Sequence, residues 1–337
     1  MKAARRVTLI LLVLLIAGAA GMWIDLQHFA RRPAGSEDTP VIISIVPGQS
    51  FDQVADELSR HGIISSKLRF RLLSHLRSED KRLKAGEYAL TSTMTPLQVL
   101  DALVRNKVLL YRLTVPEGFN HTQIAAEIAR LELADAAAFQ ALVNDPNLAA
   151  GLGHPVAGLE GYLFPDTYYF PKGVPPRKII ETMVAHFNAQ FPQAWIQRSE
   201  QLHMSVHQVV TLASIIEKET GDPLERPLIS SVFHNRLRKK MRLESDPTVI
   251  YGLKDFDGNL TRKDLMTPSP YNTYLIAALP PGPIANPGRA SIEAALFPAQ
   301  SDFLYFVSKR DGTHTFSKNY REHSAAVRKY QLRRQGQ

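Results

Sequence analysis

The stretch VVTLASIIEKET, residues 209–220, places eight consecutive apolar or small residues directly before the charged end Glu217-Lys218-Glu219. A helix that is apolar on every side is stable only when it is buried. We therefore expect a helix over residues 206–220 that crosses the core of a domain and ends at its surface.

Two carboxyl groups lie at the end of this predicted helix. Because Glu217 and Glu219 are two positions apart, they point about 200° from each other and cannot both face one bond. Apolar surroundings disfavour the charged form of a carboxyl group, which is the condition a general acid needs near neutral pH. The spacing does not choose between the two residues, and a solvated helix end without chemistry is the alternative interpretation.

Outward from this helix, the chain beyond about Pro155 combines helical and hairpin patterns. Helices are predicted over residues 177–191 and 225–238, where apolar residues recur at helical spacing. Residues 303–316 have the pattern of a β-hairpin that turns at Asp311-Gly312. The sequence therefore predicts a mixed α+β domain over residues 155–332.

A weak internal repeat precedes this domain. Val46-Pro47 matches Val115-Pro116 at an offset of 69, whereas residues 53–60 match residues 123–130 at an offset of 70, so the second copy contains one inserted residue. Each copy is predicted to form a strand, a turn and an amphipathic helix. A unit of this kind resembles the LysM-like module of wall-binding proteins, and residues 41–154 are predicted to form such a region. A small α+β packing domain that binds nothing is the alternative.

The N-terminus has the pattern of a membrane segment. Lys2, Arg5 and Arg6 precede the uncharged residues 7–24, which as a helix nearly span a hydrocarbon core of about 30 Å. The basic flank, residues 1–6, is expected to stay in the cytoplasm, and polar residues 25–40 are expected to link the anchor to the exported part. A cleaved signal peptide ending near the small residues 17–20 is the alternative.

Composition excludes several kinds of chemistry. The 337 residues include 40 Lys and Arg, 32 Asp and Glu and no Cys, so the formal net charge is +8 and disulfides and thiolate nucleophiles are excluded. The positive charge suits an anionic partner. Because no HExxH, P-loop or GxSxG motif occurs, we predict no metal and no cofactor. Export and the lack of basic stretches interleaved with aromatics argue against nucleic acid as a partner.

Five short motifs follow one another in the second half of the chain. They are LEGYLFPDTY at 159–168, ASIIEKET at 213–220, SDPTVIYG at 245–252, YNTY at 271–274 and LPPGPI at 279–284. The first pairs carboxylates with aromatic rings that could stack on sugars, but a turn held by ring packing is the simpler interpretation. In this order, and together with the apolar anchor and the repeat, the motifs resemble the YceG-like, or MltG, family of endolytic murein transglycosylases.

The resemblance implies an activity and a catalytic residue. It implies a lytic transglycosylase, a carbon-oxygen lyase that cleaves the MurNAc-GlcNAc β-1,4 bond within nascent glycan strands, leaves 1,6-anhydro-MurNAc ends and thereby sets strand length. Glu217 is then the catalytic acid, and Glu244 stands where the family pattern leads us to expect Gln. Six polar residues are predicted to bind or orient the strand: Glu219, Asn235, Asp246, Thr248, Tyr271 and Asn272.

These expectations combine into an α+β protein with a single N-terminal transmembrane helix, a LysM-like region and a catalytic domain. We expect a single-pass protein of the cell inner (cytoplasmic) membrane, with its catalytic part on the periplasmic side and peptidoglycan strands as its substrate. Peptidoglycan synthases or division proteins are further expected partners. A non-catalytic peptidoglycan-binding scaffold and a hydrolase of the same bond remain alternative functions.

Overall fold

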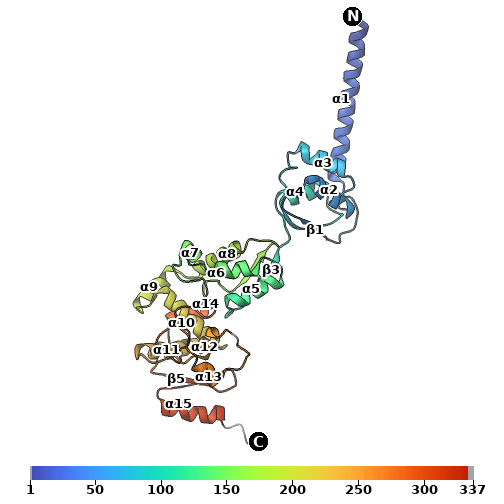
Figure 1. Cartoon of the computed structure of the whole chain (residues 1–337). Helices are drawn as coiled ribbons and strands as arrows, with labels where there is room; N and C mark the ends of the chain where they lie inside the picture. The colour runs from blue at the N-terminus through green and yellow to red at the C-terminus, as the bar shows by residue number, and fades with distance from the viewer. Residues whose placement is uncertain (1, 255, 333–337) are drawn as a thin grey trace. The chain divides into compact units, whose positions relative to one another are not determined.

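The computed structural model describes residues 2–254 and 256–332, with side chains from residue 5 onward. Met1 of the predicted cytoplasmic segment and Asp255 of the predicted catalytic domain lie outside the described residues. The chain forms two compact units (Figure 1). The first extends to Tyr111 and includes residues 171–173, and the second contains residues 112–170 and the chain from Val174 onward.

The first unit contains four helices and a two-stranded sheet. In chain order these are α1 (Lys2–Arg31), β1 (Val41–Ile45), α2 (Phe51–Arg60), α3 (Lys67–Leu76), β2 (Gly86–Leu90) and α4 (Pro96–Val104). Strands β1 and β2 are antiparallel, with Ile43 opposite Tyr88. Both side chains are fully buried, so the sheet presents an apolar face to the helices.

Helix α1 contains the predicted membrane segment and continues beyond it. The helix over Arg5–Arg31 is long and apolar enough to cross a membrane, and an 18-residue window within it has a mean hydropathy of 2.5. Residues 25–31, predicted as part of a linker, are helical instead, and Leu26, Phe29 and Ala30 are buried in the core of the first unit. The helix continues because no proline or glycine occurs between Met22 and Pro33.

The second unit contains the remaining elements. They are β3 (Tyr111–Thr114), whose first residue belongs to the first unit, α5 (His121–Arg130), α6 (Ala136–Val143), α7 (Pro146–Gly151), β4 (Thr167–Phe170), α8 (Pro176–Gln190), α9 (Gln193–Gln201), α10 (Val206–Glu219), α11 (Arg226–Arg238), α12 (Asp246–Gly252), α13 (Arg262–Leu265), α14 (Arg289–Leu296), β5 (Tyr305–Ser308), β6 (His314–Ser317), α15 (Tyr320–Val327) and a π-helical turn (Arg328–Leu332). The structure thus confirms the mixed α+β class, and the helix predicted over residues 206–220 is α10, which ends at Glu219.

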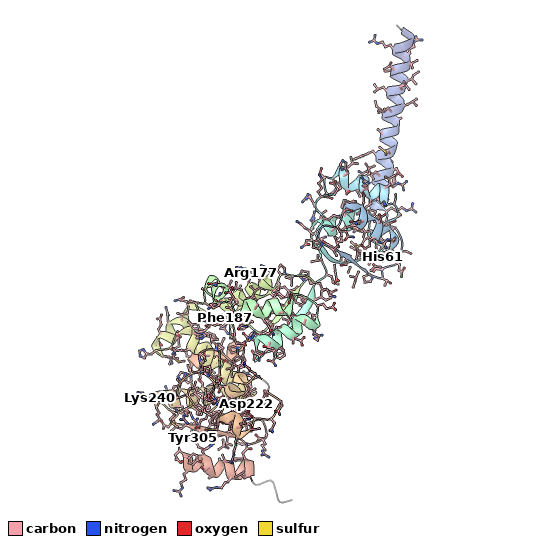
Figure 2. The ribbon with its side chains drawn as sticks, viewed as in Figure 1. His61, Arg177, Phe187, Asp222, Lys240 and Tyr305 are labelled. Carbon is pink, nitrogen blue, oxygen red and sulfur yellow. The ribbon has the colours of Figure 1, made fainter. Side chains whose placement is uncertain are left out.

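Helix α10 lies at the centre of the second unit, where α11 and α14 pack against it (Figure 1). All eight residues from Val209 to Ile216 are buried, as an all-apolar helix requires. Phe187 of α8, labelled in Figure 2, is also buried and contacts the rings of Tyr162 and Phe191. The predicted hairpin is confirmed, because β5 and β6 pair antiparallel.

The internal repeat is visible as a repeated structure. The first copy is β1-α2-α3-β2 and the second is β3-α5-α6-β4, with the short α7 added before β4. Helices α2 and α5 begin with equivalent capping boxes, Ser50 with Gln53 and Asn120 with Gln123. The second copy packs within the second unit, so residues 112–154, grouped with the LysM-like region from sequence, share a compact unit with the predicted catalytic domain.

Candidate active site

The carboxyl group of Glu217 lies at the end of the buried helix α10. A capping box of Ser205 and Gln208 fixes the start of this helix, and its buried residues fix its rotation in the core. The Glu217 side chain is only 6% exposed. The fold therefore places a carboxyl group at the edge of an apolar core, as the sequence predicted.

Two donors hold the two oxygens of Glu217. The backbone N–H of Gly288, the residue that caps the start of α14, donates to Oε2 at 2.9 Å. The guanidinium of Arg226, in the first turn of α11, donates from Nη2 to Oε1 at 3.3 Å, and its side chain is 11% exposed. Both donors hold the carboxyl group in one orientation. The site is thus built where α10, α11 and α14 meet.

A second carboxyl group, which the sequence analysis did not select, lies beside Glu217. Glu117 Oε2 is 3.7 Å from Arg226 Nη2, and the Glu117 side chain is 49% exposed. Burial raises the pKa of Glu117, the charge of Glu217 raises it further, and Arg226 acts in the opposite direction. The site therefore contains two carboxyl groups and one guanidinium.

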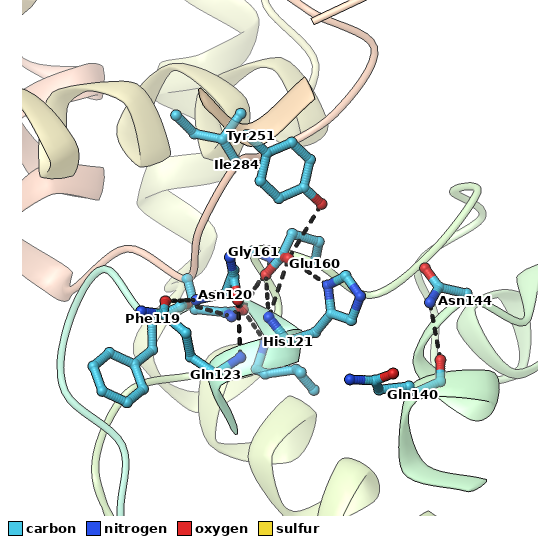
Figure 3. A network of polar contacts seen from close by, with 12 residues as sticks. Phe119, Asn120, His121, Gln123, Gln140, Asn144, Glu160, Gly161, Tyr251 and Ile284 are labelled. Atoms are coloured by element: carbon cyan, nitrogen blue, oxygen red, sulfur yellow. Dashed lines mark hydrogen bonds and ion pairs between the residues drawn. The ribbon is translucent and has the colours of Figure 1, made fainter. Parts of the chain in front are cut away.

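The segment after Glu117 is fixed by a buried polar network (Figure 3). Glu160, in the first of the five motifs, accepts hydrogen bonds from the backbone N–H of His121, from the Asn286 side chain and from the Tyr251 hydroxyl. The ring Nδ1 of His121 lies 2.6 Å from a Glu160 oxygen. Glu160 thus ties the segment at 119–121 to the segment that leads into Gly288.

The aromatic rings of the same motif are inside the protein. Tyr162 is 1% exposed, and Phe164 and Tyr168 are each 7% exposed. A ring that stacks on a sugar needs a free face. In this structure the motif therefore forms a packed turn, the simpler of the two interpretations given by the sequence.

Glu219 faces different neighbours from Glu217, as two positions on one helix require. The hydroxyl of Ser245 donates to Glu219 at 2.5 Å. Burial raises the pKa of Glu219 to about 7, with a further increase from the charge of Asp246 and opposing effects from Ser245 and Arg236. Glu219 also lines a cavity of about 260 Å³ together with Glu244, Asp246 and Tyr274. It is the alternative candidate for the acid.

The other predicted site residues fall into two groups. Asp246 and Tyr271 have partly exposed side chains: Asp246 accepts from the Tyr274 hydroxyl at 2.6 Å, and the Tyr271 ring lies 4.9 Å from that of Tyr251. Glu244, the departure from the family pattern, pairs with Arg236 at 3.0 Å.

The second group is buried and bonded within the protein. Asn235 donates to the carbonyls of Ser301 and Phe303, and Thr248 and Asn272, both 0% exposed, bond to neighbouring turns. Their side chains hold neighbouring backbone segments together inside the domain, and the structure does not place them beside Glu217. Over residues 2–254 and 256–332 no group of three or more His, Asp or Glu is arranged to hold a metal ion.

Comparisons with known proteins agree over most of the chain. Residues 43–329 match the YceG-like family. The chain is 36% identical over 315 residues to a Bacillus subtilis protein named endolytic murein transglycosylase, covering 87% of this chain and 85% of that protein. It is 29% identical to a Streptococcus pneumoniae protein of the same name, of which it spans 58%. A crystal structure of a yceG-like protein from Listeria monocytogenes is 35% identical, with a TM-score of 0.59 over 86% of this chain and 99% of that chain.

Proposed function

This chain belongs to the YceG-like family, and from that premise we propose that it is an endolytic lytic transglycosylase of peptidoglycan, a carbon-oxygen lyase. It cleaves the β-1,4 bond between MurNAc and GlcNAc inside nascent glycan strands and leaves 1,6-anhydro-MurNAc ends. Cleavage inside a strand sets the length of the strands that remain.

The observation that carries this proposal is the setting of Glu217. Its carboxyl group is almost enclosed, with one oxygen held by the Gly288 N–H and the other by Arg226. Groups that hydrogen-bond a carboxylate keep its orientation fixed while it gains or loses a proton. A fixed carboxyl group that works alone is sufficient for a reaction in which one residue is first the acid and then the base.

The proposed reaction proceeds in two proton transfers. Protonated Glu217 donates its proton to the glycosidic oxygen as the bond from that oxygen to C1 of MurNAc breaks. The resulting carboxylate accepts the proton of the C6 hydroxyl, whose oxygen bonds to C1 and closes the anhydro ring. Glu217 ends protonated, as it began, and no water is consumed. The Gly288 N–H and the Arg226 guanidinium stabilise the carboxylate between the two transfers.

The surrounding residues have proposed supporting roles. Glu219, Asp246 and Tyr271 line partly exposed surfaces of the second unit and orient the strand or stabilise charge at C1. The proposed role of the buried residues Asn235, Thr248 and Asn272 is to hold the neighbouring backbone segments in place, without direct contact with a glycan strand. No cofactor takes part.

The rest of the chain places this activity at the membrane. We propose that residues 7–24 are a retained single-pass anchor in the inner membrane, with residues 1–6 in the cytoplasm and the catalytic domain, residues 155–332, on the periplasmic side. The apolar helix α1 supports this proposal, and a signal sequence passes the same test of length and hydropathy. Residues 41–154 are proposed to act as a LysM-like strand-binding region, and the repeated strand-helix-helix-strand order supports that role. Synthases or division proteins are proposed partners.

One experiment separates the candidate functions. The full chain in detergent is incubated with purified peptidoglycan, and the products are identified by mass spectrometry. Anhydro ends are expected. Reducing ends would identify a hydrolase of the same bond, and intact strands would identify a binding scaffold.

A further inference from the structure

Helix α3 of the first unit carries a stripe of leucines on its outer side. Leu68, Leu72 and Leu76 recur every four residues, so they lie along one side of the helix, whereas Phe70 and Leu73 are buried on the other. Leu72 packs partly against the core, but Leu68 is 76% exposed and Leu76 is 54% exposed. No large apolar side chain described in the first unit has a larger exposed fraction than Leu68. The leucine stripe is therefore open to a partner outside the unit.

A second observation places α3 at the level where the membrane segment ends. The uncharged residues 7–24 of α1 are followed at once by Asp25. Arg69 of α3 contacts that carboxylate twice, from Nε to Oδ2 at 2.9 Å and from Nη2 to Oδ1 at 3.1 Å. A two-point contact of this kind fixes the geometry of both groups. Helix α3 thus lies beside the turn of α1 that follows the apolar run (Figure 1).

The leucine stripe begins on the side of α3 that faces α1. Leu72 and Leu76 are three and seven residues after Arg69, so all three lie on one side of the helix. Helix α1 is fixed relative to α3, because Phe29 is buried in the same core as Phe70. The stripe therefore borders the surface of the first unit from which α1 projects.

We propose that the leucine stripe of α3 is a membrane-docking surface, which inserts into the outward-facing leaflet of the bilayer that α1 spans. This inference rests on the proposed retained anchor. Exposed apolar side chains on one side of a helix leave water when they enter the boundary between headgroups and acyl chains. A single membrane helix attaches the first unit at one point. A second contact beside it fixes the tilt of that unit relative to the lipid surface.

The charges around the stripe indicate that insertion of apolar side chains, and not attraction to charged headgroups, drives this docking. Each Lys and Arg between residues 67 and 77 pairs with a carboxylate. The pairs are Lys67 with Asp56, Arg69 with Asp25, Arg71 with Asp52 and Arg77 with Glu79. Because these cations are already paired, docking should depend little on anionic lipid or on salt.

Single cysteines provide the test, since the chain has no cysteine of its own. Leu68→Cys in the full chain is labelled with an environment-sensitive fluorophore and reconstituted into phosphatidylcholine vesicles, with or without lipids brominated on their acyl chains. We expect blue-shifted emission and quenching by the brominated lipids. The quenching should persist at about 1 M salt, where the screening length is about 3 Å.

Two further positions serve as controls. Leu110→Cys is the matched control, because Leu110 is 51% exposed in the same unit and follows Leu109, whose N–H bonds to Glu87 of β2. A label at this position should remain in water and escape quenching. Met22→Cys lies in the apolar run of α1 and reports on the anchor itself. Its label should be quenched.

A label beside the stripe tests the leucines directly. His75 is exposed on α3, so His75→Cys carries the label while all three leucines are kept. This label should be quenched as well. Adding Leu68→Gln and Leu76→Gln should remove most of that quenching. Because both leucines are exposed, the protein should stay folded, which circular dichroism checks.

The outcomes are distinct. Quenching at positions 22, 68 and 75, lost from position 75 with the two glutamines and absent at position 110, supports the inference. Quenching at position 22 alone would overturn the docking surface and leave the anchor intact. Quenching on α3 that survives the glutamines, or that about 1 M salt abolishes, would overturn insertion of the leucines. An unquenched label at position 22 would reject the proposed anchor itself, and the inference with it.

Discussion

Replacing Asn286 with alanine should destabilise the second unit strongly. This side chain is fully buried and makes four hydrogen bonds of 2.9 Å: its oxygen accepts from the N–H groups of Gly161 and Leu163, and its nitrogen donates to Phe119 and Glu160. After the substitution, the carbonyl of Phe119 and the carboxylate of Glu160 still accept hydrogen bonds from other donors. The buried N–H groups of Gly161 and Leu163 lose their acceptor, the Asn286 side chain. An unsatisfied buried donor costs about 1–3 kcal/mol, so we expect the free energy of unfolding to fall by about 3–5 kcal/mol.

Tryptophan fluorescence during denaturation with urea measures this loss. The chain has two tryptophans. Trp195 is 7% exposed in the second unit, whereas Trp23 lies on the exposed part of α1. The change in fluorescence on unfolding therefore reports on the second unit.

Asn144→Ala is the matched control for this prediction. Asn144 is exposed, and its amide donates to the carbonyl of Gln140 one turn earlier, as Figure 3 shows. Its loss should cost less than about 1 kcal/mol. If Asn286→Ala were no less stable than Asn144→Ala, the buried network would not fix the segment that leads to the active site.

Three further predictions concern other parts of the chain. Because the pKa of Glu219 is raised, the folded state loses stability as the pH rises from about 4.5 to about 7. Glu219→Gln should therefore remove on the order of 3 kcal/mol of this pH dependence, measured by denaturation at several pH values, and should leave measurable turnover. Gly161→Ala should cost more than about 3 kcal/mol in urea denaturation, because its φ is +88° and its Cβ would overlap Pro283, whereas Gly153→Ala, with φ +90° and open space, should cost about 1 kcal/mol. A chain that begins at Asp25 should show a higher melting temperature for the first unit than one that begins at Pro40, because it keeps the three residues of α1 that pack in that core; both should still cut strands.

The periodic features of this sequence were predictable because they depend on neighbouring residues. The eight buried residues of α10 form one uninterrupted run, and its ends follow from local capping and composition. The hairpin at 305–317 follows from a short turn between two apolar strands. The repeat was detectable because both copies keep the spacing of their apolar residues.

The partners of Glu217 could not be predicted from local patterns. Glu117 is 100 residues away in sequence and Gly288 is 71 residues away, so only the folded chain brings them together. Thr248 and Asn272 show a second reason why the site could not be predicted from the sequence. Polar residues in a sequence motif can be fully buried and stabilise the fold.

The central claim is that Glu217 is the single acid and base. The direct test compares Glu217→Gln with Glu219→Gln in the full chain, with strand cleavage measured by mass spectrometry of anhydro ends and folding checked by circular dichroism. Glutamine keeps the acceptor for the Gly288 N–H but has no proton to transfer, so cleavage by Glu217→Gln should fall by at least about two to four powers of ten, with Glu219→Gln still active. Near-normal cleavage by Glu217→Gln beside an inactive, folded Glu219→Gln would contradict the account and assign the chemistry to the carboxyl group with the raised pKa.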